Sequence, residues 1–199
     1  VTGVQTCALP ISHAHELIEQ QYRLLNEEVM PALARHGIHV INHAERDAAQ
    51  RRWVADYFEH QVRPLLVPVV LDPAHPFPMV ANKSLNFILR MAKPVGQEDS
   101  GHIGIVKVPR VLPRVIRLPD KVVRRGEQGF VLLTSVIRAH LAELLPGREV
   151  EAFSQFRVTR DSDLEVDEDD VVNLRLALRS GLTTRHYGEA IRLEVVSTC

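Results

Sequence analysis

Acidic side chains are most concentrated in the segment 161–170, DSDLEVDEDD. Asp161, Asp163 and Glu165 stand at alternate positions, as the oxygen ligands of Ca²⁺ or Mg²⁺ do in some loops. An EF-hand calcium loop needs Gly at its sixth position and Glu at its twelfth, and counting from Asp161 both positions hold valine. We therefore interpret 167–170 as the cap of a following helix, where carboxylates face the positive end of the dipole.

Three histidines, His36, His39 and His43, have spacings that metal ligands can have. They are predicted to straddle a helix end, a strand and a turn, and no cysteine or carboxylate completes a zinc set. The chain has ten histidines, so such spacings also arise by chance. We assign no metal ligand.

Arginine pairs are the best candidates for binding an anion, because guanidinium groups suit bidentate phosphate contacts. Arg124 and Arg125 stand beside Gly126, and Arg157 and Arg160 fall within one predicted strand. Since Arg157 and Arg160 are an odd number of residues apart, they should project from opposite faces. At most one of them would face a shared groove, and we expect all four to be solvated or salt-bridged.

Motifs that identify an active site are absent from the sequence. It contains no Gly-rich phosphate loop, no nucleophile elbow and no H-E-x-x-H. Aromatic residues make up 5% of the chain and the net charge is −1, which do not favour nucleic-acid binding. The residues alone therefore assign no catalytic, cofactor-binding or metal-binding site.

The pattern of apolar residues predicts an α+β fold with a mostly antiparallel sheet and interleaved helices, preceded by one long helix. Pro31 predicts a kink or restart in the first helix, Gly37 a C-cap, and Pro64 the end of the second helix. The predicted helices are 13–36, 47–63, 133–145 and 168–180. The predicted strands are 38–41, 69–71, 84–92, 102–109, 113–119, 149–161 and 189–196.

Two cysteines, Cys7 and Cys199, stand at opposite ends of the chain and form no disulfide framework, which indicates a reducing compartment. No apolar run approaches the roughly 20 residues that span a bilayer. The expected location is the cytoplasm.

Several segments resemble one family, the polyphosphate kinases of the histidine-phosphorylating type, in the family's order and spacing. The FRVTRDSDLEVDEDD stretch is the most specific of them. The segments are VRPLLVPVVLDPAHPFP (62–78), GIVKVPRVLPRVIRLP (104–119), FVLLTSVIRAHLAELLPG (130–147), FSQFRVTRDSDLEVDEDD (153–170) and YGEAIRLEV (187–195).

The resemblance implies that 13–37 is the last helix of an N-terminal helical domain and 38–199 most of a head, or middle, domain. The intact enzyme would reversibly transfer the terminal phosphate of ATP to inorganic polyphosphate through a phosphohistidine, with magnesium neutralising the charge. In the family the head supports dimerisation and the active-site tunnel, so a homo-oligomer is expected. Peripheral membrane association of the intact enzyme is compatible with this resemblance.

The family's phosphoacceptor histidine lies in an H-x-K motif, and none of the ten histidines here is followed two residues later by Lys. The catalytic domains are therefore expected to be absent, no catalytic residue is transferred, and the chain alone is expected to be inactive. An alternative is a stand-alone dimerisation or polyanion-binding module. A further alternative is a metal-dependent hydrolase built on the carboxylates of 161–170.

Residues 1–12, VTGVQTCALPIS, differ from the charged helical pattern that follows. The first eleven match, codon for codon, the translation of a common sequencing-adapter oligonucleotide, and Ser12 permits the remaining base. We therefore expect 1–12 to be a non-native tail that packs against nothing, Val4 and Leu9 included, with the helix beginning at His13.

Overall fold

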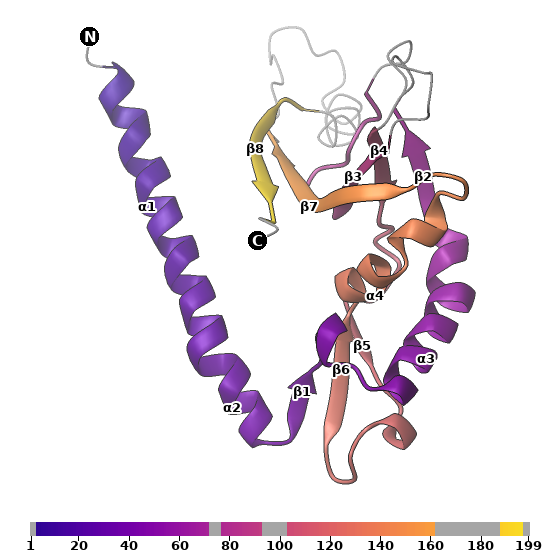
Figure 1. Cartoon of the computed structure of the whole chain (residues 1–199). Coiled ribbons are helices and arrows are strands. Elements are labelled where there is room, and N and C mark those ends of the chain that lie inside the picture. The colour runs from indigo at the N-terminus through magenta and orange to yellow at the C-terminus, as the bar shows by residue number, and fades with distance from the viewer. Residues whose placement is uncertain (1–2, 72–76, 93–102, 162–187, 197–199) are drawn as a thin grey trace, which may run out of the picture. The chain divides into compact units, whose positions relative to one another are not determined.

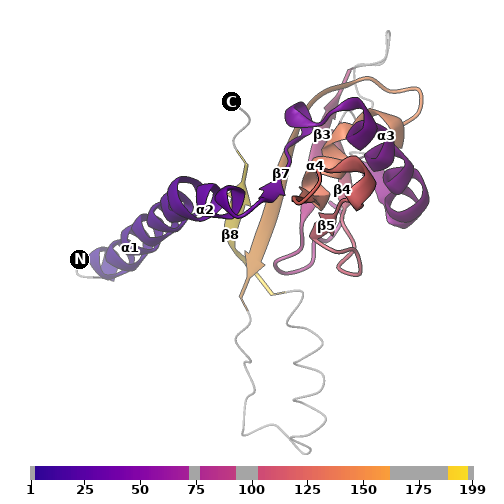
Figure 2. The same ribbon diagram turned by 90° about the horizontal axis from the view of Figure 1, so that it is seen from below.

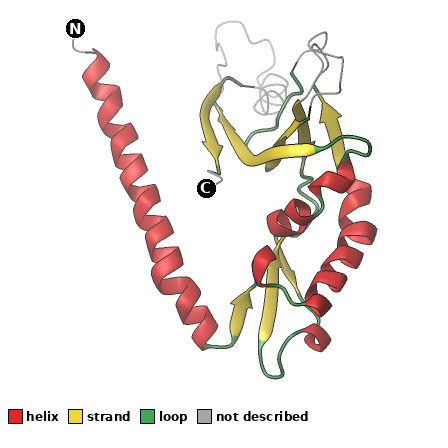
Figure 3. Ribbon diagram, in the orientation of Figure 1, coloured by secondary structure: helices red, strands yellow, loops and turns green. Residues whose placement is uncertain are grey.

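Each of the two structural units of this chain contains its own β-sheet (Figure 1). The computed structural model describes residues 3–71, 77–92, 103–161 and 188–196, with side chains from Ile11 onward. The first unit comprises 1–55 and 114–136, and the second comprises 56–113 and 137–199. Helices, strands and loops of both units are distinguished in Figure 3.

The first unit begins with a long helical segment made of α1 (Gly3–Leu24), a π-turn (Leu25–Val29) and α2 (Met30–Arg35). The prediction of a start at His13 is wrong, because α1 begins at Gly3 and continues through Pro10. Ile11 is 57% exposed, as expected, whereas Val4 and Leu9 lie outside the described side chains. The adapter origin of 1–12 stays a prediction.

The predicted restart at Pro31 and the predicted helix end at Pro64 have the same local cause. Each proline follows a π-turn, Leu25–Val29 or Phe58–Val62, whose closing hydrogen bond spans five residues. The N–H of Met30 bonds to Leu25 O, and that of Arg63 bonds to Phe58 O. A proline ring clashes with the carbonyl four residues earlier and has no N–H to bond it, and widening the turn accommodates both defects.

The helical segment ends at Gly37, which has a φ of +75° as a helix-terminating glycine does. The sheet of the first unit follows, with order β1-β6-β5: β1 (Ile38–Val40) lies parallel to β6 (Gln128–Leu132), and β5 (Val115–Arg117) lies antiparallel to β6. Ile116 is buried between two exposed neighbours, which confirms the predicted alternation.

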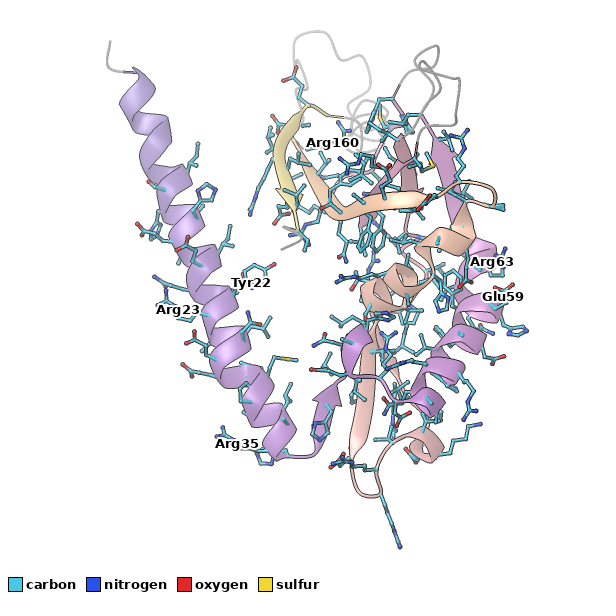
Figure 4. The ribbon with its side chains drawn as sticks, in the orientation of Figure 1. Tyr22, Arg23, Arg35, Glu59, Arg63 and Arg160 are labelled. Atoms are coloured by element: carbon cyan, nitrogen blue, oxygen red, sulfur yellow. The ribbon has the colours of Figure 1, made fainter. Side chains whose placement is uncertain are left out.

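The second helix, α3 (Ala48–Tyr57), begins with a reciprocal cap in which Gln50 N bonds to Asp47 Oδ1 at 2.8 Å and Asp47 N bonds to Gln50 Oε1 at 3.1 Å. It continues through the π-turn Phe58–Val62 into a 3₁₀ turn, Arg63–Leu65. There Arg63 Nη1 donates to both carboxylate oxygens of Glu59 at 2.7 and 2.9 Å (Figure 4). This pair raises the pKa of Arg63.

The sheet of the second unit is entirely antiparallel, with order β2-β4-β3-β7-β8 (Figures 1 and 2). Val80, Ile105 and Phe156 form a core cluster against it. The strands are β2 (Val67–Val70), β3 (Asn86–Met91), β4 (Ile103–Lys107), β7 (Val150–Arg160) and β8 (Ala190–Val195). The α+β class and the predominance of antiparallel pairing are as predicted.

One predicted helix is shorter than expected. The helix predicted over 133–145 divides into α4 (Leu133–Ala139) and a 3₁₀ turn, Leu141–Leu144. At the division, the ring of His140 stacks on Phe58, 4.4 Å between centroids, and Nδ1 of His140 lies 2.9 Å from Glu143 Oε1. These contacts hold His140 outside helical geometry. The helix predicted over 168–180 lies outside the described residues.

Candidate functional site

Arg160, at the end of β7, forms hydrogen bonds through both its side chain and its backbone (Figure 4). Its Nε donates to Val80 O at 3.0 Å and its Nη1 to Gly188 O at 2.8 Å. Its backbone N–H donates to Asn82 Oδ1 at 3.0 Å. The side chain therefore joins three segments of the second unit, and this is a structural role.

Arg157 belongs to a separate charged cluster formed by β7 and β8. Its Nη2 donates to Glu194 Oε1 at 2.9 Å, and Arg192 Nη2 lies 3.1 Å from the same oxygen. The hydrogen bonds from Arg157 hold the pKa of Glu194 below its usual 4.5, although partial burial opposes the shift. Arg157 and Arg160 make different sets of contacts, and the ladder between β7 and β8 shifts register between Thr159 and Arg160.

An apolar groove of about 390 Å³ lies along β8 in the second unit. It is distinct in character from the charged cluster, because most of its lining is aliphatic or aromatic. The lining residues include Phe77, Val80, Val158, Ile191 and Leu193, with Arg160 at its border. Sequence reasoning missed this groove, although the alternation of Ile191, Leu193 and Val195 with charged residues in AIRLEV was its signal.

A second hollow, of about 700 Å³, lies in the first unit beside β1. Lys121 and Arg124 line it, but so do Glu45, Asp47 and Glu127. This mixture of charges gives no net attraction for a polyanion such as phosphate. We assign the hollow no ligand.

The three histidines with ligand-like spacing all lie in the first unit. His36 caps α2, His39 is in β1 and His43 opens a 3₁₀ turn. His39 Nε2 lies 3.5 Å from Glu127 Oε2. Across the described part of the chain, no group of three or more His, Cys, Asp or Glu residues is placed to hold a metal ion.

Arg124 and Arg125 are exposed on the turn before β6, where Gly126 adopts a φ of +87°. Their position confirms neither anion binding nor its absence. Of the acidic segment 161–170, only Asp161 is described, and its N–H donates to Glu189 O at 2.8 Å. The remainder, including Asp163 and Glu165, lies outside the described residues.

Arg46 is a buried arginine that sequence reasoning missed. The residue is 2% exposed and its Nη2 donates to Ser135 Oγ at 2.5 Å, while its buried Nε has no hydrogen-bond partner among the described residues. Burial lowers the pKa of this guanidinium. The polar context of NHAERDAAQ offers no sequence signal for burial.

Comparisons of the sequence and of the fold with known proteins both lead to polyphosphate kinases. A family model described as the polyphosphate kinase middle domain matches residues 49–199. The crystal structure of polyphosphate kinase from Porphyromonas gingivalis shares the fold, with a TM-score of 0.68 and 23% identity over 80% of this chain and 26% of that chain. The structure is thus an α+β domain of the kind found in that enzyme.

Individual curated relatives of this sequence are also polyphosphate kinases. The polyphosphate kinase of Neisseria meningitidis is 45% identical over 195 residues, 98% of this chain and 28% of that protein. That of Xylella fastidiosa is 47% identical over 184 residues, 92% of this chain and 26% of that protein. The chain belongs to the polyphosphate kinase family and spans about a quarter of the length of these relatives. Among its described helices, none has the length and apolarity to cross a membrane.

Proposed function

We propose that this chain is the middle-domain part of a polyphosphate kinase that reversibly transfers the terminal phosphate of ATP to inorganic polyphosphate through a phosphohistidine. In this proposal the chain supports dimerisation and the active-site tunnel and has no activity by itself. The observation that supports it most directly is the match of the middle-domain family model to residues 49–199.

The proposed lack of activity is supported by the sequence of this chain. None of its ten histidines stands in an H-x-K sequence, the setting of the phosphoacceptor that the family resemblance implies. The best-placed arginines, Arg157 and Arg160, are engaged with Glu194 and with backbone carbonyls. They are not arranged around a common space where a triphosphate could bind.

Magnesium and ATP are implied by the family for the intact enzyme. Mg²⁺ prefers octahedral oxygen ligands, commonly carboxylates together with phosphate oxygens. Among the described residues, no group of three or more His, Cys, Asp or Glu residues is placed to hold a metal ion. We therefore derive no step through magnesium or ATP within the described region.

The proposal is tested by incubating the purified 199-residue chain with ATP, Mg²⁺ and a polyphosphate primer and measuring polymer formed. We expect none, with the Neisseria meningitidis enzyme as the positive control. Sustained turnover by the chain would refute the assignment. Light scattering gives the mass in the same preparation, and dimerisation predicts twice the 22.5 kDa of the chain.

A stand-alone polyanion-binding module is the second candidate, favoured by the exposed Arg124 and Arg125. It predicts binding of polyphosphate by the chain that weakens steeply with added salt, because binding would release counterions. Replacing both arginines by Gln should then abolish binding. Unchanged binding in that variant, or none in the native chain, would remove this candidate.

A further inference from the structure

Strand β8 is at the edge of the five-stranded sheet, and β7 is its partner among the described strands. Val196 N donates to Gln155 O at 3.0 Å, which fixes the phase of the β7–β8 ladder. Backbone groups alternate in direction along an antiparallel strand. The N–H and C=O groups of Leu193 and Val195 therefore point away from β7, toward an edge that no other described strand occupies.

The side chains of β8 divide sharply between its two faces. Ile191, Leu193 and Val195 are 65%, 64% and 62% exposed, and the first two line the apolar groove. Arg192 and Glu194 alternate with them and so occupy the other face. An exposed edge strand with an apolar face is a template for pairing with another strand.

We propose that β8 pairs antiparallel with β8 of a second copy of this chain, about a two-fold axis at Leu193, making one continuous sheet. The inference rests on the proposed dimerisation and names the surface that performs it. Leu193 faces Leu193 of the second copy in a hydrogen-bonded pair, because its backbone groups point outward in both copies.

Charge complementarity favours β8 of a second copy as the strand that pairs with β8. In this register Arg192 lies opposite Glu194 of the second copy, in a non-hydrogen-bonded pair where side chains approach most closely. Ile191 lies opposite Val195, so the apolar face also pairs with itself. The register of the β7–β8 ladder shifts between Thr159 and Arg160, on the N-terminal side of Arg192 in β8. The residues around Leu193, at the centre of the proposed pairing, therefore belong to regular strand.

The neighbouring registers are disfavoured by the same charges. Only alternate residues of β8 direct their backbone groups outward, and these must pair with the outward groups of the second copy. The two-fold axis can therefore pass only through a residue of β8, and the alternative registers place it at the residue before or after Leu193. An axis at Arg192 places the two Arg192 side chains opposite each other, and one at Glu194 opposes the two carboxylates. Like charges directly opposite each other are destabilising, so both neighbouring registers are less favourable than the one with its axis at Leu193.

Cysteine cross-linking tests the register in the full chain, with Cys7 and Cys199 replaced by Ser. Leu193→Cys should form a disulfide-linked dimer under copper-phenanthroline oxidation, because the Cα atoms of a hydrogen-bonded pair lie about 5.5 Å apart, within the range that a disulfide spans. Ile191→Cys is the matched control. Its copies would be separated by four residues along the strand, roughly 13 Å, too far for a disulfide.

Charge reversal supplies an independent measurement. Arg192→Glu alone should raise the dimer dissociation constant about tenfold or more, since it opposes carboxylates across the axis. Adding Arg157→Glu and Glu194→Arg restores opposite charges both within and between copies, and should recover most of the affinity. Circular dichroism confirms that each variant is folded, which is expected because β8 side chains are exposed.

The outcomes separate this inference from the proposed function. A native chain that stays monomeric refutes dimerisation and with it the β8 pairing. A native dimer that gives no Leu193→Cys cross-link, or cross-links equally through Ile191→Cys, refutes the β8 pairing alone. A native dimer whose affinity is unchanged by Arg192→Glu would likewise place the interface elsewhere.

Discussion

Nε of Arg160 donates a hydrogen bond to the backbone oxygen of Val80 at 3.0 Å, across 80 positions of sequence. The same guanidinium bonds to Gly188 O at 2.8 Å, just before β8. A single side chain thus fixes the end of β7 to the segments that lead into β3 and β8. Removal of this side chain should destabilise much of the second unit.

We predict that Arg160→Leu lowers the free energy of unfolding by about 2 kcal/mol, because charge-assisted hydrogen bonds to two backbone carbonyls are lost. Chemical denaturation with urea measures this. The matched control is Arg157→Leu, which breaks a largely exposed ion pair with Glu194 and should cost less than about 1 kcal/mol. Equal effects of the two substitutions would contradict the structural role of Arg160.

Gly188 should tolerate no side chain. A Cβ added there would fall against the carbonyl oxygen of Asp161, which is backbone and cannot move aside. We predict that Gly188→Ala reduces the melting temperature of the chain, by an amount equivalent to roughly 1–3 kcal/mol. Gly104→Ala is the control, because its added Cβ would meet its neighbours at 3.6 Å or more. A Gly188→Ala chain that melts no lower than the Gly104→Ala chain would contradict this.

Glu194 predicts a defined pH dependence. Its pKa in the folded chain lies below the usual 4.5 because Arg157 donates to it. A depressed carboxyl pKa contributes stability above the unfolded value, and the contribution disappears as the pH falls through the folded value. The destabilisation caused by Glu194→Gln should therefore be under about 1 kcal/mol at pH 7 and vanish in strong acid. A difference that grows on acidification would have the wrong sign.

Substitutions of Arg46 and of Ser135 should differ in how much they lower the free energy of unfolding. Ser135→Ala leaves the buried guanidinium without the hydroxyl that accepts its hydrogen bond, and should cost about 1–3 kcal/mol. Arg46→Met removes the buried charge and keeps most of the side-chain volume, so its cost should be smaller. Thermal unfolding of the two variants decides the order, and the reverse order would show that the charge itself stabilises the fold.

Local features of the backbone were predictable from the sequence. Pro31 and Pro64 mark changes in the helices, and Gly37 ends the first one, because backbone sterics at these residues depend little on the rest of the fold. The alternation around Ile116 likewise predicts a half-buried strand.

Features set by tertiary contacts were not predictable in the same way. The parallel pairing of β1 with β6 joins residues about 90 positions apart, and the division after Ala139 depends on the stacking of His140 on Phe58. The burial of Arg46 depends on Ser135, 89 residues later. For the candidate site, the sequence predicted where the arginines lie in β7, but the carbonyl partners of Arg160 come from distant loops.

The π-turns before Pro31 and Pro64 also determine where the helices aim their side chains. Each five-residue hydrogen bond takes up one residue more than a regular α-helical turn, which is worth roughly 100° of rotation. The angular phase of the helix therefore changes between α1 and α2, whereas only the 3₁₀ turn Arg63–Leu65 follows the second π-turn. Deleting one residue of the π-turn ahead of Pro31 would bring α1 and α2 into a common angular frame and change the direction of every side chain on one side of the turn.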